Sequence, residues 1–450
     1  MYRKRVELVA LVWLGMFSFY ISSNAAVNSG SPIVSRHGAG SQYLSYEGLV
    51  MCGYQGWFRA EGDGAGRGWV HYCSGGRFDP VHLTVDLWPD VSEYQKTYPT
   101  TLKNKDGSFA RLFSSWDEST VELHFKWMQD YGVDGVFMQR FFGVTRSDKS
   151  RKEGHVILGH ALKAAKKYGR ALAVMYDLSG LKAAGEDCSS IIQDWKELVD
   201  EIKLTSQGNN QTYLYHRGRP LVAIWGLGFS DRPYKISEIG FDKLIDFLKN
   251  DPVYGGCSIM LGVPAQFRDL KGDCVADPYL HEILARVDVV MPWVVGRYSS
   301  NADQDISRYG VHVKADVVWC TGRQLDYAAC VFPGFSWYNL MRQQAGRESP
   351  LNQIPRKQGK FYWDLIGAAI GSGAKMLYVA MFDEIDEGTA IFKCANELPV
   401  VESPVHLLGY EGVPNDHYLW LTGNAGQVLR GKSSFVKDLY LRLNHDVKSQ

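Results

Sequence analysis

Eight short apolar runs of strand length recur along the sequence, and segments of helical length separate most of them. Continuous rather than alternating apolar runs are typical of parallel strands buried on both faces. Eight such strand–helix units within about 340 residues predict an α/β fold, a (β/α)8 barrel, with a doubly wound open sheet as the alternative. The predicted strands are 49–57, 135–142, 171–177, 220–226, 257–262, 287–294, 330–337 and 376–382.

The predicted helices alternate with these strands. Ser119 and Glu122 match a capping box at the start of the first helix, and Gly169 ends the second. We expect a catalytic barrel over residues 48–395 and a C-terminal extension over 396–450 that packs on it. The long connection before the first helix, 58–118, is of a length that is usually functional in a compact domain. The predicted helices are 119–131, 154–168, 189–204, 241–249, 278–286, one within 314–327, and 361–371.

Residues 1–25 have the pattern of a secretory signal peptide. Basic residues at 3–5 precede an apolar run from Leu8 to Ile21, and small residues at 22–26 offer a cleavage site. An uncleaved anchor is the alternative. Cleavage would leave residues 26–47 as an N-terminal tail, and no second segment is apolar enough to span a membrane. The mature protein is therefore expected in the periplasm or outside the cell, without a membrane contact.

Composition excludes several classes of partner. The formal net charge is zero and no long basic or acidic run occurs, which argues against nucleic acid. The eight cysteines are scattered without a C-x-x-C pair, which argues against zinc. Export permits disulfides, but buried free thiols are an equal possibility. We expect a monomer with no cofactor and no metal.

The last predicted strand ends in four acids, Asp383, Glu384, Asp386 and Glu387. Parallel α/β enzymes present catalytic groups at the C-terminal ends of their strands. Carboxylates this close repel, so at least one of them should keep its proton to unusually high pH, which provides an acid and a base together. The alternatives are a solvated acidic turn and a Ca²⁺ loop, although the EF-hand spacing is absent.

Large aromatic and charged residues follow the other predicted strands. Aromatic residues make up 13% of the chain, and aromatic rings bind the apolar faces of sugars while carboxylates and arginine bind hydroxyl groups. Each tryptophan could instead pack in the core, Arg140 could only neutralise an acid, and Asp177 could only orient a neighbour. The predicted substrate-binding residues are Tyr54, Trp57, Arg140, Asp177, Trp225, Trp293, Trp337, Asp383 and Asp386.

The segment Phe382–Ile391 resembles the N-E-W-H-E-G-T-x-I signature of glycoside hydrolase family 99. That family contains endo-α-mannosidases and endo-α-mannanases and is related to the family 71 α-1,3-glucanases. The match keeps both glutamates, Gly-Thr and Ile391, and a weaker resemblance extends over 48–395. It implies a retaining reaction through a 1,2-anhydro sugar, in which Glu384 assists the 2-hydroxyl and Glu387 is the general acid/base.

Three positions depart from that signature, because Asp383 replaces Asn, Ile385 replaces Trp and Asp386 replaces His. The departures leave the substrate and the details of the mechanism open. The sequence thus predicts an exported glycoside hydrolase that cleaves an α-linked poly- or oligosaccharide, endo-acting and retaining, with Glu384 and Glu387 as catalytic residues. The alternatives are an exo-acting glycosidase of the xylosidase or arabinosidase type, a non-catalytic carbohydrate-binding barrel, and acids that hold Ca²⁺.

Overall fold

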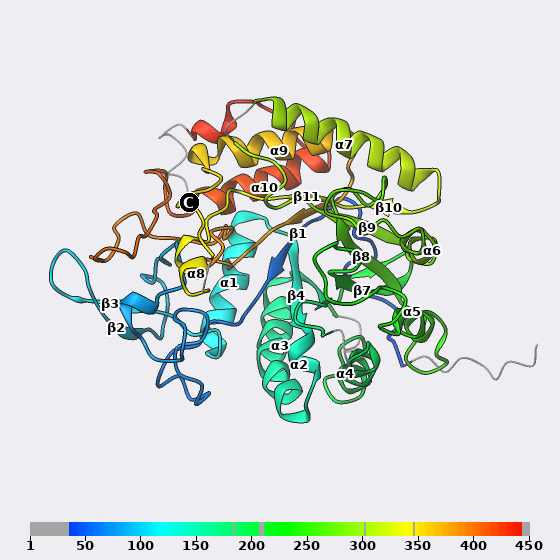
Figure 1. Ribbon diagram of the computed structural model, residues 1–450, viewed down its shortest axis with the longest axis horizontal. Helices are drawn as coiled ribbons and strands as arrows, with labels where there is room; N and C mark the ends of the chain where they lie inside the picture. The colour runs from blue at the N-terminus through cyan, green and yellow to red at the C-terminus, as the bar shows by residue number, and fades with distance from the viewer. Residues whose placement is uncertain (1–35, 183–184, 207–210, 301–302, 345–346, 443–450) are drawn as a thin grey trace, which may run out of the picture.

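The computed structural model describes residues 36–182, 185–206, 211–300, 303–344 and 347–442. Figure 1 shows parallel strands at the centre of the molecule with helices packed around them. The predicted signal peptide lies outside the described residues, as does the first part of the predicted tail. Within the described ranges, no helix combines the length and the apolar character that a membrane span requires.

The described residues form a barrel of parallel strands, which confirms the predicted fold. Neighbouring strands follow one another around the barrel in the order β10-β9-β8-β7-β5-β4-β1-β12-β11. Only Ala328 separates β10 from β11, so one continuous segment pairs with β9 on one side and with β12 on the other and closes the barrel. The strands are β1 (Val50–Tyr54), β4 (Gly135–Phe141), β5 (Ala171–Asp177), β7 (Arg219–Trp225), β8 (Ser258–Pro264), β9 (Val289–Trp293), β10 (Asp326–Tyr327), β11 (Ala329–Val331) and β12 (Leu377–Val379).

Helices cover the outside of the barrel because each has an apolar face at helical spacing. In α5, for example, Phe241, Leu244, Ile245 and Leu248 are buried. The C-terminal helix α10 packs against α1, α9 and β1, while the predicted domain boundaries stay a prediction. The helices are α1 (Glu118–Tyr131), α2 (Phe142–Thr145), α3 (Asp148–Tyr168), α4 (Ser189–Asp200), α5 (Phe241–Asn250), α6 (Tyr279–Leu284), α7 (Asp303–Thr321), α8 (Tyr338–Arg342), α9 (Lys360–Gly371) and α10 (His417–Leu429), with short 3₁₀ turns at Pro80–His82, Lys357–Gly359 and Leu439–Leu441.

Two predicted boundaries are wrong for identifiable reasons. The first helix begins at Glu118, one residue earlier than predicted, and Asp117 rather than Ser119 is its N-cap residue. The Ser119 hydroxyl has no hydrogen-bond partner, so the predicted capping box does not form. The run 330–337 is a strand only as far as Val331, because its later apolar residues belong to the loop that packs against the barrel rim. The predicted stop at Gly169 is confirmed, with this glycine in the left-handed conformation.

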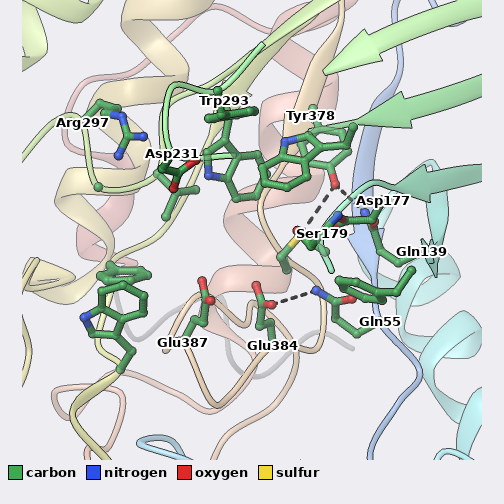
Figure 2. Close-up of a pocket in the computed structure, with 18 of the residues that line it drawn as sticks. Gln55, Gln139, Asp177, Ser179, Asp231, Trp293, Arg297, Tyr378, Glu384 and Glu387 are labelled. Carbon is green, nitrogen blue, oxygen red and sulfur yellow. Dashed lines mark hydrogen bonds between the residues drawn. The ribbon is translucent and has the colours of Figure 1, made fainter. Parts of the chain in front are cut away.

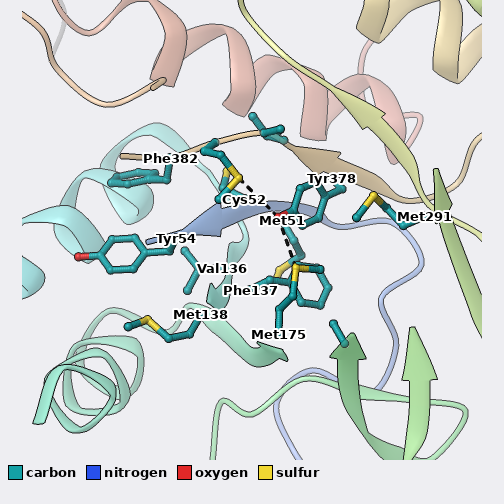
Figure 3. Close-up of a cluster of buried hydrophobic side chains, with 14 of the residues drawn as sticks. Met51, Cys52, Tyr54, Val136, Phe137, Met138, Met175, Met291, Tyr378 and Phe382 are labelled. Carbon is teal, nitrogen blue, oxygen red and sulfur yellow. Dashed lines mark hydrogen bonds between the residues drawn. The ribbon is translucent and has the colours of Figure 1, made fainter. Parts of the chain in front are cut away.

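The barrel interior is filled by sulfur-containing and aromatic side chains. Figure 3 shows Met51, Phe137, Met175, Met291 and Tyr378 converging from different strands. All eight cysteines are buried and free, which settles the open question between disulfides and buried thiols in favour of thiols.

The long connection between β1 and α1 folds over the rim of the barrel. It contains the antiparallel pair β2 (Tyr98–Lys103) and β3 (Phe109–Leu112). The buried carboxylate of Asp86 in this connection accepts hydrogen bonds from Ser336 Oγ at 2.6 Å, Tyr338 N at 2.7 Å and Asn339 N at 2.8 Å. Those bonds fix the segment that carries Trp337. A further two-residue strand, β6 (Tyr215–His216), pairs with β7 at the other end of the barrel.

Candidate active site

A cavity of about 500 Å³ opens at the C-terminal ends of the barrel strands. Figure 2 shows Glu384 and Glu387 on one side of it, with Trp293, Tyr378 and Asp177 across from them. This is the end of a (β/α)8 barrel at which catalytic groups are placed. The polar and charged residues that line it are Gln55, Gln139, Asp177, Ser179, Asp231, Arg232, Arg297, Gln353, Glu384 and Glu387.

Glu384 is held in place by two hydrogen-bond donors. Gln55 Nε2, from the end of β1, donates to its Oε1 at 2.7 Å, and Thr389 Oγ1 donates to its Oε2 at 3.1 Å. Glu387 is less buried and lines the same cavity. Its backbone carbonyl accepts from Ser336 N at 2.9 Å, which fixes the turn. Gly388 follows in a left-handed conformation at φ 64°, where a Cβ would lie 2.8 Å from Ser336 N.

Both glutamates bind protons more tightly than usual. Burial, together with the charges of Glu387 and Asp386, raises the pKa of Glu384 well above its usual range. Burial, with the charges of Asp386 and Asp177, raises the pKa of Glu387 to about 8. At neutral pH this pair therefore keeps a proton. Burial raises the pKa of Glu384 the more strongly of the two, whereas the donors Gln55 and Thr389 favour its charged form, so the geometry is compatible with Glu384 as the charged member once the pair holds a single proton.

The two aspartates of the same segment face elsewhere. Asp383 is fully buried and does not line the cavity, since its two carboxylate oxygens accept from Gln55 N and Gly56 N, each at 2.8 Å. Burial raises the pKa of Asp383 to about 7. Asp386 faces His71, whose Nδ1 lies 3.3 Å from its Oδ2, and it lines a separate smaller cavity behind the rim. In this structure neither aspartate reaches the cavity in which substrate binding was predicted.

Four tryptophans form much of the apolar lining, namely Trp57, Trp225, Trp293 and Trp337. The rings of Trp225 and Trp293 meet edge to face, with their centroids 5.1 Å apart. Gly262 on the neighbouring strand makes this possible, because a Cβ there would lie 2.4 Å from the Trp225 ring. Trp57 stacks on His71 at 3.7 Å. The structure thus brings together the four predicted tryptophans, Asp177 and both glutamates.

Tyr54 and Arg140 do not reach the cavity, which corrects their predicted roles. Tyr54 is fully buried on the helix side of β1, and its hydroxyl lies 2.9 Å from Nδ1 of His124 in α1. Arg140 points out of the barrel toward α4, where its Nε donates to Asp194 Oδ2 at 2.8 Å. It therefore neutralises an acid, as the alternative interpretation held. The cause is strand alternation, because successive residues point to opposite faces.

Several lining residues were absent from the predicted set, among them Gln55, Gln139, Tyr378 and Arg232. Gln139 is the neighbour of Arg140 and points into the barrel, where its Nε2 donates to the Tyr378 hydroxyl at 3.0 Å. The signal that could have found it is the period-two pattern that puts Gln139 on the inner face with Phe137. Arg232 has no comparable signal, because it lies in the loop after β7.

The cavity has an unusual concentration of unpaired polar atoms. Among the described residues, six of its buried polar atoms have no hydrogen-bond partner, whereas buried polar groups in folded proteins are nearly always paired. They combine donors with acceptors, as a hydroxyl-rich ligand would require. The six are Gln55 Oε1, Gln139 Oε1, Trp57 Nε1, Trp225 Nε1, Trp337 Nε1 and Arg232 Nε.

A second group of potential metal ligands lies away from the cavity. His155, Asp194 and Glu197 approach one another between α3 and α4. Arginines already neutralise both acids, since Arg140 binds Asp194 and Arg151 Nε donates to Glu197 at 2.7 Å. This group fits an ion-pair network better than a metal site. The four acids of 383–387 face two directions and do not converge as a Ca²⁺ loop requires.

No model of a known protein family matches the sequence, and no curated protein matches it. Two solved structures of the GH99 endo-α-mannosidase from Bacteroides thetaiotaomicron align with this chain, one of them in complex with bis-tris propane. The alignments have TM-scores of 0.57 and 0.56 at 16% sequence identity, and each covers 86% of this chain and 98% of the mannosidase chain. The chain therefore shares the barrel fold of a GH99 enzyme, the fold that the resemblance of Phe382–Ile391 implied.

Proposed function

We propose that the protein is a glycoside hydrolase that cleaves an α-linked poly- or oligosaccharide with net retention. The observation that carries this proposal is the pairing of Glu384 and Glu387 in one cavity lined by tryptophans and unpaired polar atoms. Two carboxyl groups that share a proton provide an acid and a base at the same pH. The GH99 fold of the barrel agrees with this chemistry.

The cavity suits a sugar in shape and in polarity. Trp225, Trp293 and Trp337 offer apolar ring faces, against which the C–H faces of a sugar pack. The side-chain oxygens of Gln55 and Gln139 are buried acceptors without a partner, and sugar hydroxyls would satisfy them. Asp177 accepts from Ser179 N at 2.7 Å and lines the cavity. Burial raises the pKa of Asp177 to about 6.

In the proposed reaction Glu387 gives its proton to the leaving glycosidic oxygen. The resemblance implies that Glu384, as the charged member, takes the proton of the sugar 2-hydroxyl while that oxygen attacks the anomeric carbon and forms a 1,2-anhydro sugar. Glu387, now a carboxylate, accepts a proton from the water that opens this ring at the anomeric carbon, while Glu384 returns its proton to the 2-oxygen, which restores the starting protonation. Two displacements at one carbon leave its configuration unchanged, so the outcome is retention.

We also propose that the mature protein is exported to the periplasm or the cell exterior. The basic start and apolar run of residues 1–25 support this. Extracellular or periplasmic polysaccharide would then be accessible as substrate. Edman sequencing of the protein purified from the host medium or periplasm tests the cleavage, with a new N-terminus near residue 26 as the expected result.

A hydrolysis screen tests the enzymatic proposal. The mature protein and its Glu384→Gln and Glu387→Gln variants are incubated with α-mannans, α-glucans, xylans and arabinans, and the products are read by mass. Glu397→Gln is a matched control, because Glu397 is exposed and forms a surface ion pair with Lys105. Product release by the wild type and the control alone is the expected result.

The same screen separates the alternatives. Internal fragments of several lengths indicate endo action, whereas a single terminal sugar indicates an exo-acting enzyme. Glycan binding by all four proteins without any product would contradict hydrolysis and favour the carbohydrate-binding barrel. Proton NMR of the first product gives its anomeric configuration, and inversion would contradict the proposed mechanism.

A further inference from the structure

Within the described part of the chain, Arg232 is a cation of the cavity without a direct ion-pair partner. It lines the cavity from the loop after β7, and its buried Nε has no hydrogen-bond partner. No carboxylate among the described residues forms a direct ion pair with it, and its charge acts on the cavity acid Asp177 only at longer range, where burial raises the pKa of that carboxyl group and the charge of Arg232 partly lowers it. A partly buried cation without a partner is costly, so a ligand that supplies an anion would be favoured.

The second arginine of the cavity shows the contrast. Arg297 also lines the cavity, but its Nε donates to Asp273 Oδ2 at 2.7 Å. Figure 2 shows Arg297 and Asp231 on the same side of the cavity, away from Gln55 and Gln139. Arg297 therefore adds positive potential at one side of the cavity while its charge is already matched within the protein. Arg232 has no such direct partner among the described residues, so its N–H groups are available to a ligand.

Two aromatic rings hold the Arg232 guanidinium in place. Its central carbon lies 5.4 Å from the Trp225 ring centroid and 5.2 Å from that of Phe229. Contacts of this kind use the faces of the rings and the guanidinium and leave N–H groups at its edge. The rigid fork of donors on a guanidinium matches the paired oxygens of a carboxylate, sulfate or phosphate group. Arg232 is thus oriented before any ligand binds.

The geometry leads us to propose that Arg232 binds an anionic substituent of the saccharide, so that the substrate is an acidic glycan. This inference rests on the proposed function of the same cavity. The anion is the carboxylate of a uronic acid or a sulfate or phosphate ester, which share the oxygen geometry that the guanidinium recognises. The unpaired amide oxygens of Gln55 and Gln139 already provide acceptors for neutral hydroxyls. Asp177, Glu384 and Glu387 would repel an anion elsewhere in the cavity, so Arg232 also sets its orientation.

The test measures binding without turnover, in the Glu387→Gln protein. The probes are matched oligosaccharides of α-mannose and α-glucose, each as the neutral form, with one glucuronic acid, with a 6-sulfate and with a 6-phosphate. We expect one acidic form to bind at least about tenfold more tightly than its neutral parent, which is about 1.4 kcal/mol. The three acidic arms identify which anion is preferred.

Variants then assign the preference to Arg232. Arg232→Gln in the same protein is expected to abolish the preference for the acidic form, and Arg232→Lys to keep part of it. Arg323→Gln is the matched control, because this exposed arginine also stacks on a tryptophan, Trp319, at 3.9 Å, but lies outside the cavity. In the protein with Arg232 intact, sodium sulfate should displace the acidic glycan more than sodium chloride does at equal ionic strength. This competition tests the anion site even if the variants at position 232 do not fold.

Equal binding of acidic and neutral glycans would overturn the inference, and so would a preference that Arg232→Gln leaves unchanged. Its failure is distinguishable from failure of the proposed function. Hydrolysis of neutral glycans only would contradict the acidic substrate and keep the enzyme. Binding of acidic glycans that depends on Arg232, with no product from the wild type, would contradict the enzyme and keep the anion site.

Discussion

The segment 383–387 carries two pairs of acids with the same spacing and different surroundings. Glu384 and Glu387 line the cavity, whereas Asp383 and Asp386 point into the framework behind it. Within each pair the two acids are three residues apart in one turn, so the members of a pair lie on the same side of the chain and the two pairs lie on different sides. The comparison shows that the direction in which each side chain points, rather than the density of charge, separates the two acids suited to catalysis from the two that stabilise the turn carrying them.

The largest expected effect concerns the cavity pair. Glu387→Gln should lower kcat/KM by about 10²- to 10⁴-fold on a natural glycoside, because glutamine cannot protonate the leaving oxygen. The loss should be much smaller for a glycosyl fluoride, which needs no such proton. Steady-state kinetics on both substrates checks this. An equal loss on the two substrates would contradict the role of Glu387 as the general acid, and the assignment of catalysis to the cavity pair would then lose its main support.

The framework pair should instead affect stability. Asp383→Ala leaves the buried N–H groups of Gln55 and Gly56 without acceptors and should lower the free energy of unfolding by about 3 kcal/mol. Urea denaturation followed by tryptophan fluorescence measures it. The exposed Asp438→Ala variant is the control, with a change within about 0.5 kcal/mol. A similar small change for Asp383→Ala would show that its two hydrogen bonds do not hold the turn.

The pH profile of activity tests the shared proton. A group with a raised pKa keeps its proton below that pKa and loses it above. The pKa of Glu387 is about 8, so kcat/KM should stay high at neutral pH and fall about tenfold per pH unit above about 8. The observed value belongs to the glutamate pair as a whole. A profile whose alkaline limb lies near pH 5 would show that the pair is not coupled.

The smallest effect should come from Asp386. Its charge raises the pKa of both glutamates, so Asp386→Asn should move the alkaline limb of kcat/KM to lower pH while the maximum rate changes little. Matched pH–rate profiles of the wild type, this variant and Asp438→Asn measure the shift. An unchanged limb would show that Asp386 acts on the site only through its contact with His71.

The barrel was predictable because its strands are continuous apolar runs. The strand 171–177 was predicted with the observed bounds, and each of the other predicted runs contains or overlaps a barrel strand. Where an apolar run continued past the strand, as in 330–337, composition alone did not reveal the end. Hydrogen bonds from distant residues decide that point, since Asp86 holds the loop after Val331.

The site was predictable at the level of strand ends and not at the level of side-chain direction. Gln139 and Arg140 are adjacent, yet one faces the cavity and the other faces α4. A shift of one residue exchanges the two faces of a strand, and the sequence does not fix that phase where both faces are buried. Arg232 lies in a loop, where no periodic pattern applies, so only the folded chain places it in the cavity.

The buried thiols have a practical consequence for spectroscopy. None of the eight cysteines is exposed, and burial raises the pKa of their thiols, which makes them poor nucleophiles toward maleimide dyes. A single cysteine introduced by Asp231→Cys at the exposed rim could therefore be labelled without removing any native cysteine. Its fluorescence would report glycan occupancy in real time.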